Sequence, residues 1–367
     1  MNIKNIILTS LFFLISGAAA GQANQTAVAG LRVEPDPIST GRGVTGVADA
    51  SDANAVFWNP AGLGFSDESR LALSRFKWLP GLDDDLTYNY LSGSHFLDGI
   101  GTIGGHITYL DLGSQSFRDE QGNSGGSFSS YEFSMGVSIG RVAIPDQLSL
   151  GLGVRFISSR LAPSGVDIGG VETKTGNTFG VDLGALWDLG ESSTFGKEST
   201  TRLGVSITNF GGRVSYSSSG VKESIPTLFR AGIFHRIDLD ENAINTLTLT
   251  SDISKLLVRS DSSGAQNAFA ALVTSWSGYQ YFNGEKTSNV SLPEQLMIGL
   301  GVEYWYNAML AVRAGYYNES KANGGRRFLT VGGSLHYAGI AFNASIAFQQ
   351  GYSAVKNIVR LGVLVQL

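Results

Sequence analysis

After residue 70, apolar residues alternate with polar or small residues over much of this 367-residue chain. In residues 148–156, every second position holds leucine, valine or phenylalanine, and the positions between them hold serine, glycine or arginine. Successive side chains of a β-strand point to opposite faces of a sheet, so the pattern predicts strands with one apolar face. We recognise about fourteen such segments, near residues 70–77, 85–95, 101–112, 130–141, 147–160, 178–189, 201–210, 228–238, 245–257, 294–305, 309–318, 327–337, 339–349 and 357–367.

The links between these segments differ in length in a regular way. Short links follow the even-numbered segments, whereas most links after odd-numbered segments are long, including 113–129, 161–177, 211–227 and 258–293. Periplasmic turns and longer outward loops are typical of bacterial outer-membrane barrels, whose tilted strands need about 9–11 residues to cross the bilayer. We therefore expect an all-β fold, a transmembrane antiparallel β-barrel of about 14 strands over residues 67–367, with both termini on the periplasmic side.

The composition favours a membrane barrel over a soluble domain. Only 16% of the residues are charged, whereas soluble domains have roughly 25%. No segment after residue 20 is apolar for long enough to cross a bilayer as a helix. The acidic balance, with a net charge of −5, does not favour a nucleic-acid partner.

Residues 1–20 have the three parts of a secretory signal peptide. Lys4 supplies the positive charge, residues 6–15 form an apolar stretch, and three alanines at 18–20 supply a small-residue cleavage site. The apolar stretch is too short for a membrane-spanning helix. The chain is therefore expected to be exported.

The segment between the signal and the first strand, residues 21–66, is rich in glycine and turn-forming residues. We predict that it forms a plug, or hatch, inside the barrel. Pro60 holds Asn59 away from the helical conformation, and the Asn59 side chain can close a turn of its own. Glycines allow the backbone to approach closely within a narrow lumen. The residues assigned to the plug motif are Gly41, Gly43, Gly46, Asp49, Trp58, Asn59, Pro60 and Ala61.

Charged residues on the polar face of the predicted strands should point into the barrel, because a basic residue facing lipid costs about 2–4 kcal/mol near the midplane. These residues are Glu132, Arg155, Asp182, Arg202, Arg230, Asp252, Glu303, Arg313 and Arg360. Two interpretations stay open: the charges pair into a network that fills the interior and anchors the plug, or they line a wet lumen. With either one, the interior is poorly suited to the passage of an apolar ligand.

The chain offers no convincing catalytic or metal site. Residues 136–140 match the G-x-S-x-G pattern of a hydrolase nucleophile, but they lie within a predicted strand and no helix pattern follows. The histidines are scattered singly over separate strands, without a metal-ligand spacing: His95, His106, His235 and His336. We therefore expect no enzymatic activity, no cofactor and no metal.

The long link 258–293 combines serine, glycine and asparagine with aromatic residues. The aromatic residues are Phe269, Trp276, Tyr279, Tyr281 and Phe282. Long loops with apolar content of their own are often functional. Two interpretations of this link stay open: contact with a partner, or a cap that folds over the barrel.

The N-terminal segment also resembles a known family. Three stretches are similar to the start of the PorV family, outer-membrane shuttle proteins of the type IX secretion system: residues 31–36 (LRVEPD), 48–50 (ADA) and 58–61 (WNPA). The Asn-Pro-Ala motif is shared with the wider group of FadL-like barrels. The chain departs from the usual PorV pattern at residues 37–39 and 41–43.

The resemblance implies a non-enzymatic role in the cell outer membrane. Members of the PorV family are thought to receive cargo proteins with a C-terminal signal domain from the translocon and to pass them to the surface-attachment machinery. The implied partners are outer-membrane lipid, the translocon, attachment-complex proteins and the cargo. The alternative is a FadL-like channel that takes up hydrophobic small molecules through a movable hatch; the charged inward face favours the first interpretation.

Overall fold

The computed structural model describes residues 26–49, 52–81, 85–118, 124–168, 170–261, 264–282, 287–350 and 357–367. The predicted signal peptide, residues 1–20, lies outside the described part of the chain.

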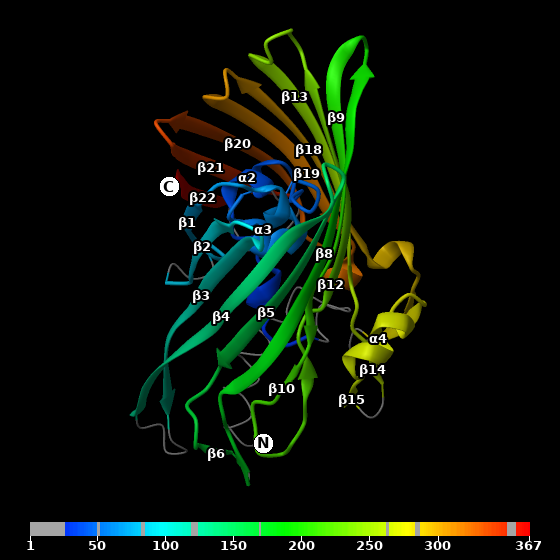
Figure 1. Ribbon diagram of the computed structural model, residues 1–367. Coiled ribbons are helices and arrows are strands. Elements are labelled where there is room, and N and C mark those ends of the chain that lie inside the picture. The colour runs from blue at the N-terminus through cyan, green and yellow to red at the C-terminus, as the bar shows by residue number, and fades with distance from the viewer. Residues whose placement is uncertain are drawn as a thin grey trace.

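Fourteen antiparallel strands form a closed barrel in which each strand pairs with the next one along the barrel and the last pairs with the first (Figure 1). The strands are β1 (Arg70–Lys77), β2 (Thr87–Leu97), β3 (Gly101–Arg118), β4 (Ser124–Ile144), β5 (Leu148–Arg160), β8 (Gly176–Thr194), β9 (Lys197–Gly211), β12 (Leu228–Asp238), β13 (Asn245–Leu256), β18 (Leu296–Tyr306), β19 (Leu310–Glu319), β20 (Arg327–Tyr337), β21 (Ile340–Gln349) and β22 (Ile358–Gln366). Each overlaps one predicted segment, so the prediction of an all-β barrel is confirmed.

The alternating residues divide between the two faces of the wall. On β5, Leu150 and Leu152 are each 49% exposed, whereas Arg155 is buried inside the barrel. An apolar outer face is what contact with lipid tails requires. Among the described residues, no helix is long and apolar enough to cross a membrane.

The predicted loop 113–129 is mostly strand, so that expectation was wrong. β3 and β4 extend to 18 and 21 residues, and they pair across an irregularity between Asp111 and Ser114. Gly113, with φ +76°, lies at this irregularity. The extension is rich in serine and glycine because a hairpin that projects beyond the bilayer needs no apolar face.

The N-terminal segment lies inside the barrel (Figure 1). Its described residues form four short helical elements: η2 (Ala29–Arg32), α2 (Pro37–Gly41), α3 (Ala55–Trp58) and η3 (Pro60–Phe65). α2 packs against β19, β20, β21 and β22, whereas η3 packs against β3, β4, β5 and β8. The segment therefore contacts opposite parts of the wall across the lumen, and we call it the plug.

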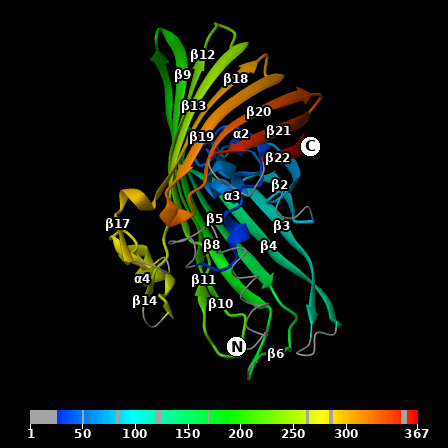
Figure 2. The same ribbon diagram turned by 180° about the vertical axis from the view of Figure 1, so that it is seen from behind.

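The long links gather at one end of the barrel and the short turns at the other (Figures 1 and 2). We call these the long-link end and the short-turn end. The small elements of the long links are β6 (Asp167–Ile168), β7 (Val171–Glu172), β10 (Arg213–Val214), β11 (Glu223–Ser224), β14 (Ser260–Asp261), β15 (Gly264–Ala265), α4 (Ala268–Thr274), β16 (Tyr279–Phe282), β17 (Thr287–Val290), η4 (Pro293–Gln295) and η5 (Lys321–Asn323).

Helix α4 lies beside the outer wall of the barrel (Figure 1). Phe269 packs edge-on against Phe210 of β9, with 5.0 Å between ring centroids, and Trp276 packs against Phe229 of β12 at 5.4 Å. This part of link 258–293 therefore flanks the wall and does not cap the bore.

The chain runs through the lumen from one end to the other. Thr26 forms a parallel bridge with Ser224 at the long-link end, whereas β1 begins at the short-turn end, where Arg70 pairs with Gln366 of β22. The start of β1 and the end of β22 therefore lie at the same end, as expected for the two termini, but the start of the described chain does not. The described chain begins at the opposite end because the plug spans the lumen before the first strand.

Candidate functional site

The candidate site is the plug together with the lumen side chains that hold it. Trp58, which is 1% exposed, donates from Nε1 to Oδ2 of Asp36 at 2.7 Å. Asp36 also caps α2, since its Oδ1 accepts from the backbone N–H of Ser39 at 2.7 Å. A Cβ added at Gly46 would lie 2.5 Å from the Trp58 ring. These contacts fasten α2 to α3 within the plug.

Asn59 joins the plug to the wall. Its Nδ2 donates to the carbonyl of Val47 at 2.9 Å and to the carbonyl of Ala185 in β8 at 3.1 Å. Its Oδ1 accepts from the N–H of Ala61 at 3.1 Å, which is the side-chain turn that the sequence predicted. Asn59 is extended, with φ −160° and ψ 103°, and Pro60 begins η3 directly after it.

Glycines of the plug meet glycines of the wall. Gly43 has φ +70°, and a Cβ there would lie 2.3 Å from the carbonyl oxygen of Leu300. Gly41 lies against Gly332 of β20. The wall glycines recur on the inward face of the strands, and alternation alone predicted no role for them. A Cβ would come within 2.0–2.5 Å of a plug atom at each of Gly140, Gly151, Gly184, Gly204, Gly299, Gly301 and Gly315.

Four of the predicted lumen charges form hydrogen bonds with the plug. Oδ2 of Asp252 accepts from the N–H groups of Gly46 and Val47 at 2.8 and 3.0 Å. The other three contacts are Glu132 with the N–H of Gly30 (2.6 Å), Arg360 with the carbonyl of Glu34 (3.2 Å), and Glu303 with Arg42 (3.3 Å). The buried carboxylates of Asp252 and Glu132 thus give partners to backbone N–H groups of the plug.

The remaining predicted charges contact the wall or the aromatic residues of the plug. Arg155 and Asp182 form a buried ion pair, with 2.6 Å between Nη2 and Oδ2. Arg313 pairs with Glu303, and Arg202 pairs with Asp188, which was not among the predicted residues. Arg230 lies over the rings of Phe57 and Trp58, at 5.5 and 5.3 Å. The nine charges thus form separate local contacts and not one network.

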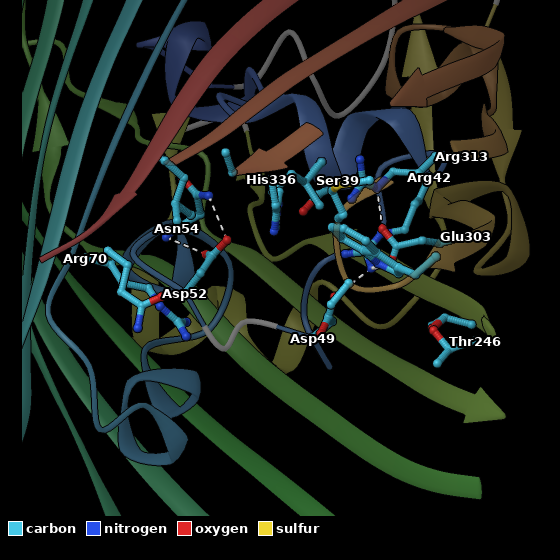
Figure 3. Close-up of a pocket in the computed structure, with 18 of the residues that line it drawn as sticks. Ser39, Arg42, Asp49, Asp52, Asn54, Arg70, Thr246, Glu303, Arg313 and His336 are labelled. Atoms are coloured by element: carbon cyan, nitrogen blue, oxygen red, sulfur yellow. Dashed lines mark hydrogen bonds and ion pairs between the residues drawn. The ribbon is translucent and has the colours of Figure 1, made fainter. Parts of the chain in front are cut away.

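A cavity of about 670 Å³ lies between the plug and the short-turn end (Figure 3). Its inner boundary includes Arg42 and Trp58 of the plug, and Glu303 and Arg313 of the wall also line it. Asp52 lies at the same cavity and accepts from the N–H and Nδ2 of Asn54 at 2.7 and 3.1 Å. Burial raises the pKa of Asp52 to about 6, and the carboxylates of Asp36 and Asp49 add to the effect.

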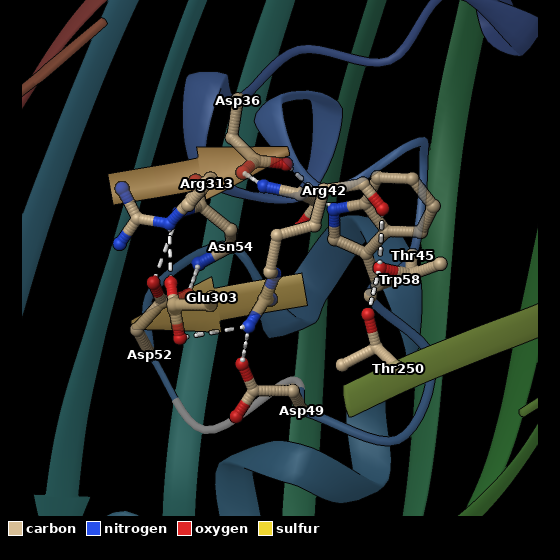
Figure 4. Close-up of polar contacts among 12 residues, drawn as sticks. Asp36, Arg42, Thr45, Asp49, Asp52, Asn54, Trp58, Thr250, Glu303 and Arg313 are labelled. Atoms are coloured by element: carbon tan, nitrogen blue, oxygen red, sulfur yellow. Dashed lines mark hydrogen bonds and ion pairs between the residues drawn. The ribbon is translucent and has the colours of Figure 1, made fainter. Parts of the chain in front are cut away.

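Arg42 links the plug to this cavity and to the wall (Figure 4). It is 1% exposed, and its Nη1 donates to Asp49 at 2.6 Å and to Glu303 at 3.3 Å. From the sequence, Gly41 and Gly43 were assigned to the plug motif, whereas Arg42 was noted only as part of a departure from the family pattern. The position of Arg42 between two glycines could have indicated a buried arginine. Gly41 and Gly43 let the backbone lie close to the wall, and the Arg42 side chain is buried there.

Residues 17–263 match the family described as Type IX secretion system protein PorV. This chain belongs to the PorV family. The match covers more than half of the chain and includes the plug and the strands from β1 to β13. The resemblance noted in the N-terminal segment is therefore confirmed, and the protein is an outer-membrane β-barrel.

This PorV-family barrel is also similar to three solved structures of FadL type, at low identity. A Pseudomonas aeruginosa FadL homologue is 12% identical, with 91% of this chain and 97% of that chain covered and a TM-score of 0.44. The Ralstonia pickettii toluene transporter TbuX is 16% identical, with 90% and 96% covered and a TM-score of 0.46. The Pseudomonas putida toluene transporter TodX is 14% identical, with 91% and 98% covered and a TM-score of 0.49. No curated protein matches this PorV-family sequence.

The motif that resembles a hydrolase nucleophile lies in the barrel wall. Residues 136–140 are within β4. Ser138 is buried, and its Oγ lies so close to Gly153 that a Cβ added there would be only 2.4 Å away. Among the described residues, no group of three or more His, Asp or Glu side chains is placed to hold a metal ion.

Proposed function

We propose that this protein binds secreted proteins carrying a C-terminal signal domain and transfers them from the type IX translocon to the surface-attachment machinery. The observation that carries the proposal is a plug fixed to the wall on opposite sides of the lumen, in a member of the PorV family. A bore closed in this way leaves the barrel ends and the outer wall for contact with proteins.

The long-link end is the surface that we assign to cargo and translocon. On α4, Phe269 and Val273 are 75% and 76% exposed, and Trp276 lies two residues after the end of the helix. Adjacent exposed apolar side chains mark sites of protein contact more often than scattered ones do. We place this end outside the cell, as the alternation of long and short links predicts.

The alternative function, a FadL-like channel for hydrophobic molecules, requires the plug to move. Movement would break the buried hydrogen bonds of Asn59 and Asp252 and bring a ligand past Arg155 and Asp182. Each unsatisfied buried polar group costs about 1–3 kcal/mol. These contacts favour the secretion role.

The test is purification from native outer membranes in mild detergent, with an affinity tag inserted within residues 351–356 between β21 and β22. We expect mass spectrometry to identify a very large barrel protein and secreted proteins that share a C-terminal domain. The double variant Phe269→Ser, Val273→Ser should lose most of this recovery. Phe195→Ser is the matched control, because Phe195 is 95% exposed in a short turn at the opposite end. A clean monomer carrying a bound apolar ligand would overturn the proposal.

A further inference from the structure

The outer face of the wall changes character toward the long-link end of β1 to β5. Strand pairing aligns one outward-facing residue from each of these strands in rows that cross the wall. The apolar row consists of Leu73, Leu91, Ile107, Met135 and Phe156. Its first four side chains are between 37% and 55% exposed, as the lipid-facing residues of a barrel are.

The next two rows toward the long-link end hold polar and aromatic residues. The Arg75 row consists of Arg75, Asn89, Tyr109, Phe133 and Ser158, and the Lys77 row consists of Lys77, Thr87, Asp111, Tyr131 and Arg160. The rings of Tyr109 and Tyr131 stack with 5.8 Å between their centroids, so both rows lie on the same face. Aromatic and polar residues replace apolar ones where a barrel leaves the lipid tails. The lipid tails therefore end at these two rows.

Three cations at this level point away from the lumen. Arg75 and Lys77 on β1 are exposed, and Arg160 on β5 is half-buried. The guanidinium groups of Arg75 and Arg160 form no ion pair or hydrogen bond with any residue that the structure describes. A basic side chain is costly beside lipid tails but not at the level of the head groups. The two arginines are therefore available to an anion that lies at the bilayer surface.

The residues between the cations suit an uncharged group that carries hydroxyls. From Lys77 to Arg160 the Lys77 row crosses four strand-to-strand spacings, or about 19 Å at about 4.8 Å for each. Side chains that lean toward each other from both ends shorten this span to the length of a disaccharide. In between, Thr87 and Asp111 offer hydrogen-bonding oxygens, and Tyr131 offers a ring face. Asp111, whose Oδ1 accepts from a nearby backbone N–H at 2.9 Å, would repel a phosphate placed at the middle of the row.

On the flank beside α4, the corresponding cation is already enclosed by the protein. Lys255 follows the outward-facing positions of β13, but it is fully buried, because the ring of Trp276 lies 5.7 Å from Nζ and Gln295 accepts from Nζ at 2.7 Å. Figure 1 shows β1 to β3 on the side of the barrel away from α4. A lipid that recognises cations would therefore bind to the flank of β1 to β5.

We propose that the outer face of β1 to β5 binds a lipid whose disaccharide head group carries a phosphate at each end. Arg75 and Lys77 bind one phosphate, Arg160 binds the other, and the acyl chains lie along the apolar row. Guanidinium groups match the geometry of phosphate oxygens. The lipid belongs to the leaflet at the long-link end, which is the outer leaflet in the orientation that we propose. The site does not involve α4, so it is independent of the surface assigned to cargo.

The test uses the purified full-length barrel in mild detergent and native mass spectrometry, which counts the lipids that stay bound. The probe is lipid A with both phosphates, and its matched comparison is the same lipid A after removal of both phosphates. Each basic residue near an anionic head group strengthens binding about fivefold, so three should favour the phosphorylated form on the order of 100-fold. Equal binding of the two forms, or no binding of the phosphorylated form, would overturn the proposal.

Variants assign the effect to these rows. The double variant Arg75→Gln, Lys77→Gln should weaken binding of the phosphorylated probe about 30-fold, and Arg160→Gln about fivefold. Arg141→Gln is the matched control, because Arg141 is exposed on β4 at the short-turn end, where it pairs with Leu150. Equal weakening by Arg141→Gln would mean that the lipid responds to net charge alone and would overturn the site. Heat-modifiable gel mobility checks that each variant is folded.

Recovery of partner proteins separates this site from the secretion role. The double variant Arg75→Gln, Lys77→Gln should still recover translocon proteins from native outer membranes, since α4 is unchanged. Loss of lipid binding with normal recovery of partners is the expected result. Normal lipid binding in this folded variant would overturn the proposal and leave the secretion role untouched.

Discussion

Replacing Asn59 with alanine removes the contact that fastens the plug to β8. The side chain makes three buried hydrogen bonds, to Val47, Ala185 and Ala61, and is fully buried. At about 1 kcal/mol for each net hydrogen bond, the plug should lose about 3 kcal/mol of stability. The barrel wall should keep its own stability, because none of its strand-to-strand hydrogen bonds involves this side chain.

Hydrogen–deuterium exchange on the purified barrel measures this loss locally. A change of about 3 kcal/mol corresponds to about 100-fold faster exchange of amides in the plug, provided that they exchange through local opening. Peptides that cover residues 52–66 report on the plug, and peptides from β21 report on the wall. The matched control is Asn242→Ala, since Asn242 is exposed in the short turn between β12 and β13.

Two outcomes would refute the reasoning. Unchanged exchange in residues 52–66 would mean that the Asn59 hydrogen bonds do not hold the plug. Equal acceleration in the plug and in β21 would mean that the plug and the wall open as a single unit. With the expected outcome, the plug is a separately stabilised element within the barrel.

Three further predictions follow from the plug contacts and the chain path. Gly315→Ala should accelerate hydrogen exchange in the plug, because the added Cβ would lie 2.1 Å from the backbone nitrogen of Gly43. Gly333→Ala is the control and should leave the exchange unchanged, because no atom would lie closer than 3.3 Å to its Cβ. Because burial raises the pKa of Asp52 from 3.8 to about 6, its ionisation destabilises the plug increasingly between these pH values and fully above them. Asp52→Asn should therefore raise the temperature at which the plug unfolds at pH 8 and change it little at pH 4. A larger increase at pH 4 than at pH 8 would contradict this. An epitope inserted directly before Thr26 should bind antibody on intact cells, unlike one at Phe195 in a short turn, and the reverse pattern would invert the assigned orientation.

The wall could be predicted from the sequence because the bilayer imposes one rule on every strand. Alternation is strict where a strand crosses lipid, as in residues 148–156, and this located all fourteen strands. Strand residues outside the bilayer are not bound by this alternation. The outer parts of β3 and β4 have no lipid to face, so their serine- and glycine-rich sequence was interpreted as a loop.

The contacts of the plug were harder to predict, because they depend on where side chains of different strands meet. The inward direction of Arg202 follows from the cost of placing charge in lipid, but its pairing with Asp188 depends on the register of β8 and β9. Wall glycines such as Gly184 and Gly315 received no role of their own from the sequence, since close approach to a plug leaves no mark in period-two alternation. Arg42 was passed over because its contact with Glu303 depends on how the plug lies against β18.

The path of the N-terminal segment has a consequence for biogenesis. The segment enters at Thr26, crosses the lumen and leaves at Arg70, where β1 joins β22, the last strand to be synthesised. We expect the plug to be enclosed while the wall is still open, because the finished cylinder grips it from opposite sides. The plug then serves as the core around which the insertion machinery wraps the strands, and a damaged plug would impair assembly before it could affect a finished protein.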